Sequence, residues 1–169
     1  VHNLNYYRGK LDPGTKVMAM VKAFSYGSGS YEIANVLQFH QVDYLTVAYA
    51  DEGVELRKSG IKLPIMVMNP DEESFDSMLK YQLEPEIYSF RVLKMLESAL
   101  LRHSPNSQPV GIHIKIDTGM HRLGFDPVEV DELINQIKGR PNIIVKSVFS
   151  HLAASDNESL PATGHRACP

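Results

Sequence analysis

Short apolar runs alternate with amphipathic segments along most of the chain, and this alternation predicts strands and helices in turn. From the apolar runs we expect strands at residues 16–21, 44–47, 63–68, 84–87, 110–116 and 144–149. In the segments between them, apolar residues three and four apart share one face, which is typical of helices. We expect these helices at residues 31–40, 51–58, 73–81, 90–102 and 127–138, after a short polar helix at 3–10.

Residues that favour helix ends support these boundaries. Asp126 is a suitable N-cap for the last helix, and Pro127 occupies its first position, where a missing N–H costs nothing. Gly60 and Gly139 each follow a helix, at the position that commonly adopts a left-handed conformation.

About six strands with helices between them predict an α/β fold with a parallel sheet and right-handed crossovers. No G-x-G-x-x-G opens the first crossover, which disfavours a dinucleotide-binding sheet. A (β/α)8 barrel takes roughly 250 residues, so 169 residues supply about its first six βα units. An unclosed barrel exposes two sheet edges, which a complete protein avoids. We therefore expect a partial (β/α)8 barrel that is a piece of a longer protein.

The two ends of the chain agree with that expectation. The first residue is Val1 rather than a methionine, and residues 160–169 show no hydrophobic period. We expect the barrel to cover residues 1–159 and an irregular tail to follow it.

Composition narrows the function classes. Hydrophobic residues make up 43% of the chain, charged residues 22%, and the formal net charge is -3, so no basic patch indicates a nucleic-acid partner. The single cysteine, Cys168, excludes an intrachain disulfide framework and favours a reducing compartment. No apolar run is long enough to span a bilayer, and no signal peptide is evident, so we expect a cytoplasmic protein without a membrane partner.

The stretch VMAMVKAFSYGSGS, residues 17–30, contains the first candidate for chemistry. Its apolar run is typical of a parallel strand covered on both faces, and the run ends at Lys22. A lysine desolvated at such a strand end can form a Schiff base, although a lysine that merely extends to solvent has the same pattern. Tyr26 is a candidate to bind a phosphate through its hydroxyl, or a half-buried packing ring.

The stretch HIKIDTGMHRLGF, residues 113–125, is the second dense segment. Alternation places His113, Lys115 and Asp117 on one side of a strand, and a buried charge on that side needs a partner. The guanidinium of Arg122 suits a carboxylate or phenolate, and the alternative is a structural ion pair that closes a loop.

His151 follows the last strand, where its ring can lie beside a planar cofactor or fill a core position. A metal site from His113, His121, His151 and Asp156 matches no standard ligand spacing, so we expect no metal.

These stretches together resemble a known family. VKAFSYGSGS resembles the pyridoxal-phosphate lysine segment of alanine racemases (fold type III), HIKIDTGMHRLGF resembles their second signature, and SHLAASD is similar to their third. The three occur in the family's order, on the first, fifth and sixth predicted strands, and the likeness runs over residues 3–159. The chain is thus identified as resembling the N-terminal barrel portion of that family.

The resemblance implies a role for each matching residue. Lys22 would bind pyridoxal 5'-phosphate covalently and act as one acid–base group at the substrate Cα. Tyr26 would bind the cofactor phosphate, and Arg122 would face its phenolic oxygen and the substrate carboxylate. Lys115 matches a lysine that is often carbamylated and would support Arg122, while His151 would stand beside the pyridine ring. The catalytic residues would thus be Lys22, Arg122 and His151.

The implied activity is interconversion of L-alanine and D-alanine for peptidoglycan synthesis in the cell wall, by a protein that works as a homodimer. The family's β domain, which carries the opposing tyrosine base, is absent from this chain, so we expect the chain alone to racemise alanine inefficiently. The sequence departs from the family at Ser28, where His is common, and at His121, where Gly is common.

Two other functions remain open from the sequence. One is a barrel protein that binds pyridoxal phosphate without a reaction of its own. The other is a related enzyme that acts on serine or decarboxylates an amino acid. The wording FSYGSGS and FHQVDYL is also similar to racemases fused behind a UDP-N-acetylmuramoyl-tripeptide–D-alanyl-D-alanine ligase.

Overall fold

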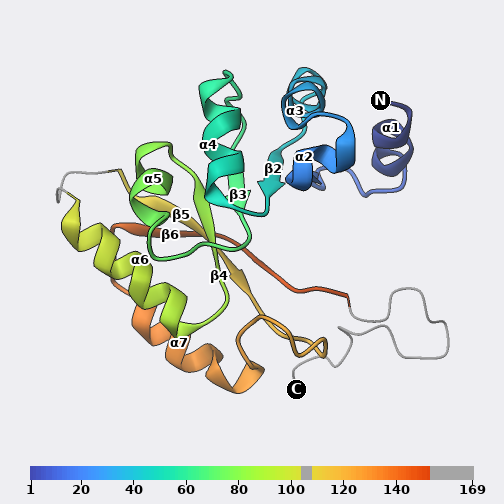
Figure 1. Ribbon diagram of the computed structural model, residues 1–169. Coiled ribbons are helices and arrows are strands. Elements are labelled where there is room, and N and C mark those ends of the chain that lie inside the picture. The colour runs from blue at the N-terminus through green and yellow to red at the C-terminus, as the bar shows by residue number, and fades with distance from the viewer. Residues whose placement is uncertain (104–107, 153–169) are drawn as a thin grey trace. The chain divides into compact units, whose positions relative to one another are not determined.

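The structure, a computed structural model, describes residues 1–103 and 108–152. Six parallel strands pair in chain order, and β1 and β6 are the two end strands of this sheet (Figure 1). The described chain divides into two compact units, Val1–Pro85 and a second unit that begins at Glu86. The boundary falls within β4, whose first two residues pair with β3 and whose last two pair with β5. The predicted α/β fold with six parallel strands is confirmed.

The observed elements lie close to the predicted ones. The strands are β1 (Met18–Met20), β2 (Tyr44–Val47), β3 (Ile65–Val67), β4 (Glu84–Ile87), β5 (Val110–Lys115) and β6 (Ile143–Phe149). The helices are α1 (His2–Arg8), α2 (Lys22–Gly27), α3 (Ser30–Phe39), α4 (Ala50–Lys58), α5 (Phe75–Lys80), α6 (Phe90–Arg102) and α7 (Val130–Ile137), with a 3-10 turn, η1 (Pro127–Glu129), before α7. Two expectations for helix ends are confirmed: the Asp126 side chain accepts from the Val128 N–H, and Gly60 and Gly139 have positive φ.

The first unit packs its helices on a small apolar core. Its largest fully buried side chains are Leu45, Leu56, Ile65, Phe75, Met78 and Leu83. Arg57 of α4 joins the neighbouring connections, because its guanidinium donates to the carbonyls of Ile61 at 2.9 Å and Tyr81 at 3.1 Å. Burial, with Glu84 nearby, raises the pKa of Tyr44 to about 12. The Arg57 hydrogen bonds thus tie α4 to the segment that follows it and to the end of α5.

The second unit packs α6 and α7 along β5 and β6, and the two helices lie side by side (Figure 1). Its largest fully buried side chains are Ile87, Leu93, Leu96, Ile112, Phe125 and Leu133. An ion pair of 2.7 Å joins Arg140 to Glu97 of α6, and the rings of Phe90 and Phe125 meet edge to face. The loop after β5 is therefore anchored to α6 through Phe125.

The prediction that the first strand is covered on both faces is wrong. Met18 is 39% exposed and Met20 is 42% exposed, so one face of β1 is open. The strand is also shorter than expected, and its parallel ladder with β2 runs from Met18 to Met20. Val21, just beyond it, is fully buried.

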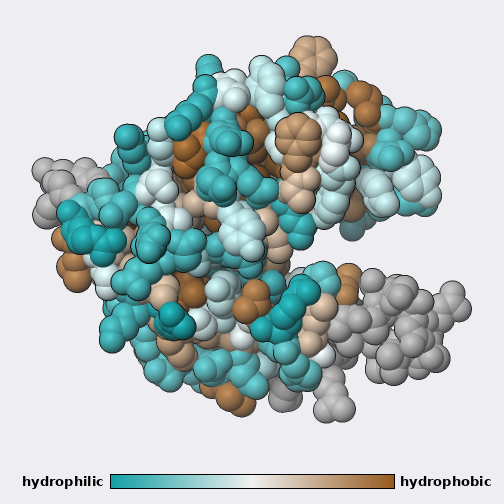
Figure 2. All heavy atoms as spheres, viewed as in Figure 1, coloured by the Kyte–Doolittle hydropathy of each residue, from teal (hydrophilic) through white to brown (hydrophobic). Residues whose placement is uncertain are grey.

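Figure 2 shows apolar residues at the surface among hydrophilic ones over the helices of the first unit. Large apolar side chains that are more than half exposed include Tyr6, Tyr7, Phe24, Tyr26, Phe39 and Tyr49. Within residues 1–103 and 108–152, no helix has the length and apolar character that crossing a membrane requires.

Candidate active site

Lys22 lies two residues after the end of β1, beyond the carboxyl end of the strand, where parallel α/β proteins place working residues. Its side chain is half-buried, and its amine makes no hydrogen bond or ion pair with another described residue. The backbone before it is fixed, since the Val21 N–H donates to the Thr46 carbonyl at 2.9 Å. Lys22 therefore presents a free primary amine beside a buried strand end.

The backbone after Lys22 is unusual. Four consecutive residues, Ala23, Phe24, Ser25 and Tyr26, have φ between 49° and 55°, so the segment is a turn of left-handed helix. None of them is glycine, and each non-glycine residue in this conformation costs roughly 1–2 kcal/mol. Strain of this kind persists only where surrounding contacts impose it, and it is concentrated at functional sites.

Tyr26 lies within this left-handed turn. Its side chain is 72% exposed, and its hydroxyl lies 3.9 Å from the Met20 sulfur. The Tyr26 ring is therefore not the half-buried packing ring that was its alternative. The phenol is free to contact a bound molecule.

A carboxylate that the sequence analysis missed supports the turn. Glu52, in the first turn of α4, accepts a hydrogen bond of 2.7 Å from the Ala23 N–H. An acidic residue early in a helix is a recognisable capping signal. Its bond to Ala23, which is far away in the sequence, could not be predicted from the sequence.

The second candidate region is the loop that joins β5 to η1. Phe125 closes it: the Phe125 N–H donates to the Lys115 carbonyl, and the Asp117 N–H donates to the Phe125 carbonyl, each at 2.9 Å. Asp117 Oδ1 accepts from the N–H groups of Gly119 and His121 at 2.9 and 3.1 Å. These N–H groups hold the pKa of the Asp117 carboxyl below its usual value. Arg122 is thus presented on a short, closed loop.

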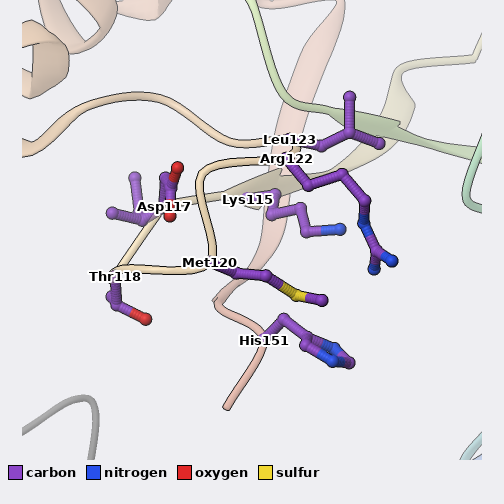
Figure 3. Close-up of a pocket in the computed structure, with 8 residues that line it drawn as sticks. Lys115, Asp117, Thr118, Met120, Arg122, Leu123 and His151 are labelled. Carbon is purple, nitrogen blue, oxygen red and sulfur yellow. The ribbon is translucent and has the colours of Figure 1, made fainter. Parts of the chain in front are cut away.

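This loop borders a pocket. Figure 3 shows the amine of Lys115, the guanidinium of Arg122 and the imidazole of His151 pointing to the same side of the loop. The complete lining is Lys115, Ile116, Asp117, Thr118, Met120, Arg122, Leu123 and His151, around about 200 Å³ of empty space that includes open solvent. The structure therefore brings together three of the predicted site residues, all in the second unit. Lys22 and Tyr26 belong to the first unit.

Lys115 is the buried member of this group, and it has a partner that the sequence analysis missed. Its Nζ lies 3.0 Å from Oε1 of Glu86, and the two side chains are 5% and 0% exposed. Burial raises the pKa of Glu86, while Lys115, His113 and Arg122 oppose that rise. The second carboxylate oxygen, Oε2, has no hydrogen-bond partner among the described residues. The charged Glu86 within the predicted strand at 84–87 was the available signal, because a carboxylate in a buried strand needs a partner of opposite charge.

Arg122 does not form the loop-closing ion pair that was its structural alternative. Its side chain is exposed and makes no hydrogen bond or ion pair with another described residue. His151 is likewise exposed rather than a core residue. Both groups are accessible to a ligand.

The remaining histidines are dispersed. His113 is buried and its Nδ1 lies 2.7 Å from the Ser147 hydroxyl, while His121 faces Asp117 at 3.5 Å. In the described part of the chain, no three His, Cys, Asp or Glu side chains are placed to bind one metal ion. Asp156, Cys168, the end of the SHLAASD stretch and the predicted tail at 160–169 lie outside the described residues.

Comparison with known proteins assigns the chain to a family. The family model for the alanine racemase N-terminal domain matches residues 1–167. The chain belongs to the alanine racemase family. Alanine racemase of Clostridium kluyveri is 37% identical over 163 residues, which cover 92% of this chain and 39% of that protein. A serine/alanine racemase of Enterococcus gallinarum is 36% identical over 157 residues, 92% of this chain and 21% of that protein.

Solved structures of the family have the same fold. Alanine racemase of Clostridium difficile 630 superposes with a TM-score of 0.81 at 34% identity, over 89% of this chain and 40% of that chain. The enzyme of E. faecalis gives 0.82 at 29% identity, over 93% and 42%. The predicted class, the first six βα units of a barrel, is thereby confirmed. The chain spans between 21% and 42% of the length of these relatives.

Proposed function

We propose that the protein to which this chain belongs interconverts L-alanine and D-alanine with pyridoxal 5'-phosphate as cofactor, and supplies D-alanine for peptidoglycan synthesis in the cytoplasm. The observation that carries the proposal is the free amine of Lys22 at the end of β1, in a chain of the alanine racemase family. A primary amine without a partner can condense with the aldehyde of this cofactor.

The other side chains suit the same cofactor. Arg122 supplies positive charge to a pocket that is also lined by Lys115, whose ammonium is paired with Glu86, and His151 adds a flat ring there. An anionic aromatic molecule with a phosphate needs these properties, since a guanidinium pairs with oxyanions and rings stack on rings. The exposed hydroxyl of Tyr26 is available as a phosphate ligand.

Each residue would then have one task. Lys22 would hold the cofactor and remove or return a proton on one face of the substrate Cα. Arg122 would bind the cofactor's phenolic oxygen and orient the substrate carboxylate, with Lys115 as its support, and His151 would lie against the ring. When bound, the cofactor would supply an electron sink for the Cα carbanion.

Inversion needs a second acid–base group on the opposite face, and the family resemblance assigns that role to a tyrosine from a β domain across a homodimer. That residue is not part of this chain, so racemisation belongs to the whole protein. Fusion to a ligase stays a prediction from the sequence wording alone.

The proposal is tested in two steps. Adding pyridoxal 5'-phosphate to this chain should produce the absorption band of a lysine Schiff base, and a Lys22→Ala variant should lack it. The whole protein should then convert L-alanine to D-alanine, with L-serine as a second substrate to compare. A band that persists in Lys22→Ala would contradict the role of Lys22. A band at Lys22 without conversion of either amino acid would favour the non-catalytic cofactor-binding protein.

A further inference from the structure

Glu52 is placed to hold the backbone where Lys22 leaves β1. Its Oε1 accepts from the Ala23 N–H at 2.7 Å, and its Oε2 accepts from the Ala48 N–H at 2.7 Å and the Tyr49 N–H at 3.1 Å. One carboxylate therefore joins the segment that follows β1 to the segment that follows β2. Hydrogen bonds to an ionised acceptor are the stronger kind.

Helix capping explains only part of this arrangement. A glutamate at the third helical position commonly accepts from the N–H of its own N-cap residue, which for α4 is Tyr49. The bond to Ala23 crosses 29 positions of sequence and has nothing to do with the start of α4. Among the described residues, it is the one hydrogen bond that joins residues 22–28 to a distant part of the chain.

The bond to Ala23 falls at the first residue of the left-handed turn. The remaining supports of that turn are local: the Gly29 N–H donates to the Phe24 carbonyl at 3.1 Å, and the Ser25 and Ser30 hydroxyls both donate to the Val21 carbonyl. These local hydrogen bonds can stabilise the shape of the turn, but they do not fix its position relative to the rest of the unit. Among the hydrogen bonds of the described residues, the one to Glu52 is the one that ties the turn to a segment outside residues 20–30.

Lys22 lies between two such anchors. The Val21 N–H before it is bound to β2, and the Ala23 N–H after it is bound to Glu52. We infer that Glu52 is a positioning residue, which fixes the direction in which the Lys22 side chain leaves the strand. The inference rests on the proposed function of Lys22 and adds to it a residue that does not touch the cofactor.

The test compares Glu52→Gln with Glu55→Gln, a control on the same helix. Glutamine keeps the length of glutamate, but it is neutral and its NH2 end cannot accept, so the N–H groups of Ala23, Ala48 and Tyr49 all lose their bond to a charged acceptor. The Glu55 side chain is exposed and makes no hydrogen bond or ion pair with a described residue.

Amide hydrogen exchange of the ligand-free chain gives the first readout. In Glu52→Gln, exchange at Ala23 should be at least about tenfold faster, the size expected for a lost hydrogen bond to a charged group. Exchange at Leu45, which is bonded to the Pro64 carbonyl in the sheet, should not change, and Glu55→Gln should match the wild type at both positions. Equal acceleration at Ala23 and Leu45, or none at Ala23, would overturn the inference.

The absorption band formed with pyridoxal 5'-phosphate gives the second readout. At equal folded content by circular dichroism, Glu52→Gln should form the Lys22 band at least about tenfold more slowly than Glu55→Gln. Equal rates would overturn the positioning role. If the wild-type chain forms no band at Lys22, the proposed function fails instead, and hydrogen exchange alone decides whether Glu52 holds the turn.

Discussion

The turn that follows β1 and the loop that follows β5 both present candidate site residues just beyond a strand, but different contacts hold them. The turn after β1 contains four left-handed residues other than glycine and is fixed by Glu52, which lies 29 positions from Ala23. The loop after β5 is held by its own Asp117 and by the strand residues that it closes on. One region depends on a distant side chain, and the other is largely self-contained.

This difference indicates which substitutions should destabilise each region. The loop after β5 uses Gly119 and Gly124 where φ is 127° and 135°, so its difficult conformations fall on glycine. An exception is His121, with φ of 53°. In the turn after β1, by contrast, the four residues with positive φ, residues 23–26, are not glycines. Four substitutions test this contrast, and they follow in order of decreasing effect.

The buried ion pair beneath the loop should give the largest effect. Glu86→Gln leaves the ammonium of Lys115 without its counter-charge in a site with 5% exposure, which should lower the free energy of unfolding by about 3–5 kcal/mol. The double variant Glu86→Leu with Lys115→Met should recover most of that loss, because no buried charge remains. Urea unfolding measures both, and a double variant as unstable as Glu86→Gln would contradict the account.

Gly124 should be the next most sensitive position. A Cβ there would lie 2.5 Å from the Asp117 nitrogen and 2.7 Å from the Ile116 carbonyl carbon, which are backbone atoms that cannot move aside. We expect Gly124→Ala to cost about 2–4 kcal/mol in urea unfolding, through overpacking and strain. Gly139→Ala is the matched control, since its Cβ would meet nothing within 4 Å, and it should cost about 1 kcal/mol. Equal losses would show that space at Gly124 does not limit the loop.

The left-handed turn should respond in the opposite direction. Ala23→Gly relieves a strained residue, so the free energy of unfolding should stay equal or rise by up to about 1 kcal/mol, after the entropy that glycine adds to the unfolded chain. Ala34→Gly, in the right-handed helix α3, should lower it by about 1–2 kcal/mol. Thermal unfolding of the two variants gives the comparison. A clear loss in Ala23→Gly would argue against strain at this turn.

Asp117 should produce the smallest effect, and one that depends on pH. Because backbone N–H groups lower its folded-state pKa beneath the unfolded value of about 3.9, its contribution is complete above that pH and is lost as pH falls through the folded pKa. The wild-type chain should therefore lose stability more steeply than Asp117→Asn as the pH is lowered from 5. Parallel stability curves for the two proteins over this range would contradict the lowered pKa.

Much of the fold is readable from the sequence, because periodicity reports which face of an element is covered. The bounds of β2, β4 and α6 match the predicted ranges, and the Asp126 cap with Pro127 marks the start of η1. The prediction for β1 was wrong because its apolar run suggested cover on both faces, and that cover depends on other elements that pack on the sheet rather than on the strand's own residues. No pattern in the chain reveals that β1 is an end strand.

The site residues are readable only in part. The strand ends pointed to Lys22 and, with the loop after β5, to Arg122 and His151, of which the last two meet in one pocket with Lys115. Glu52 and Glu86 were missed because a carboxylate's partner is set by tertiary contacts rather than by spacing. The left-handed turn was missed because Ala, Phe, Ser and Tyr carry no local preference for positive φ.

The proposed function depends most on the amine of Lys22 as the attachment point of the cofactor. The most direct test is to incubate this chain with pyridoxal 5'-phosphate, reduce the adduct with borohydride, and locate the modified lysine by mass spectrometry of its peptides. If Lys22 is the attachment point, Lys22 should be the one dominant modified residue, with little modification at Lys115 or at the exposed lysines. A label spread over surface lysines, or one that is just as strong on a Lys22→Ala variant, would contradict it.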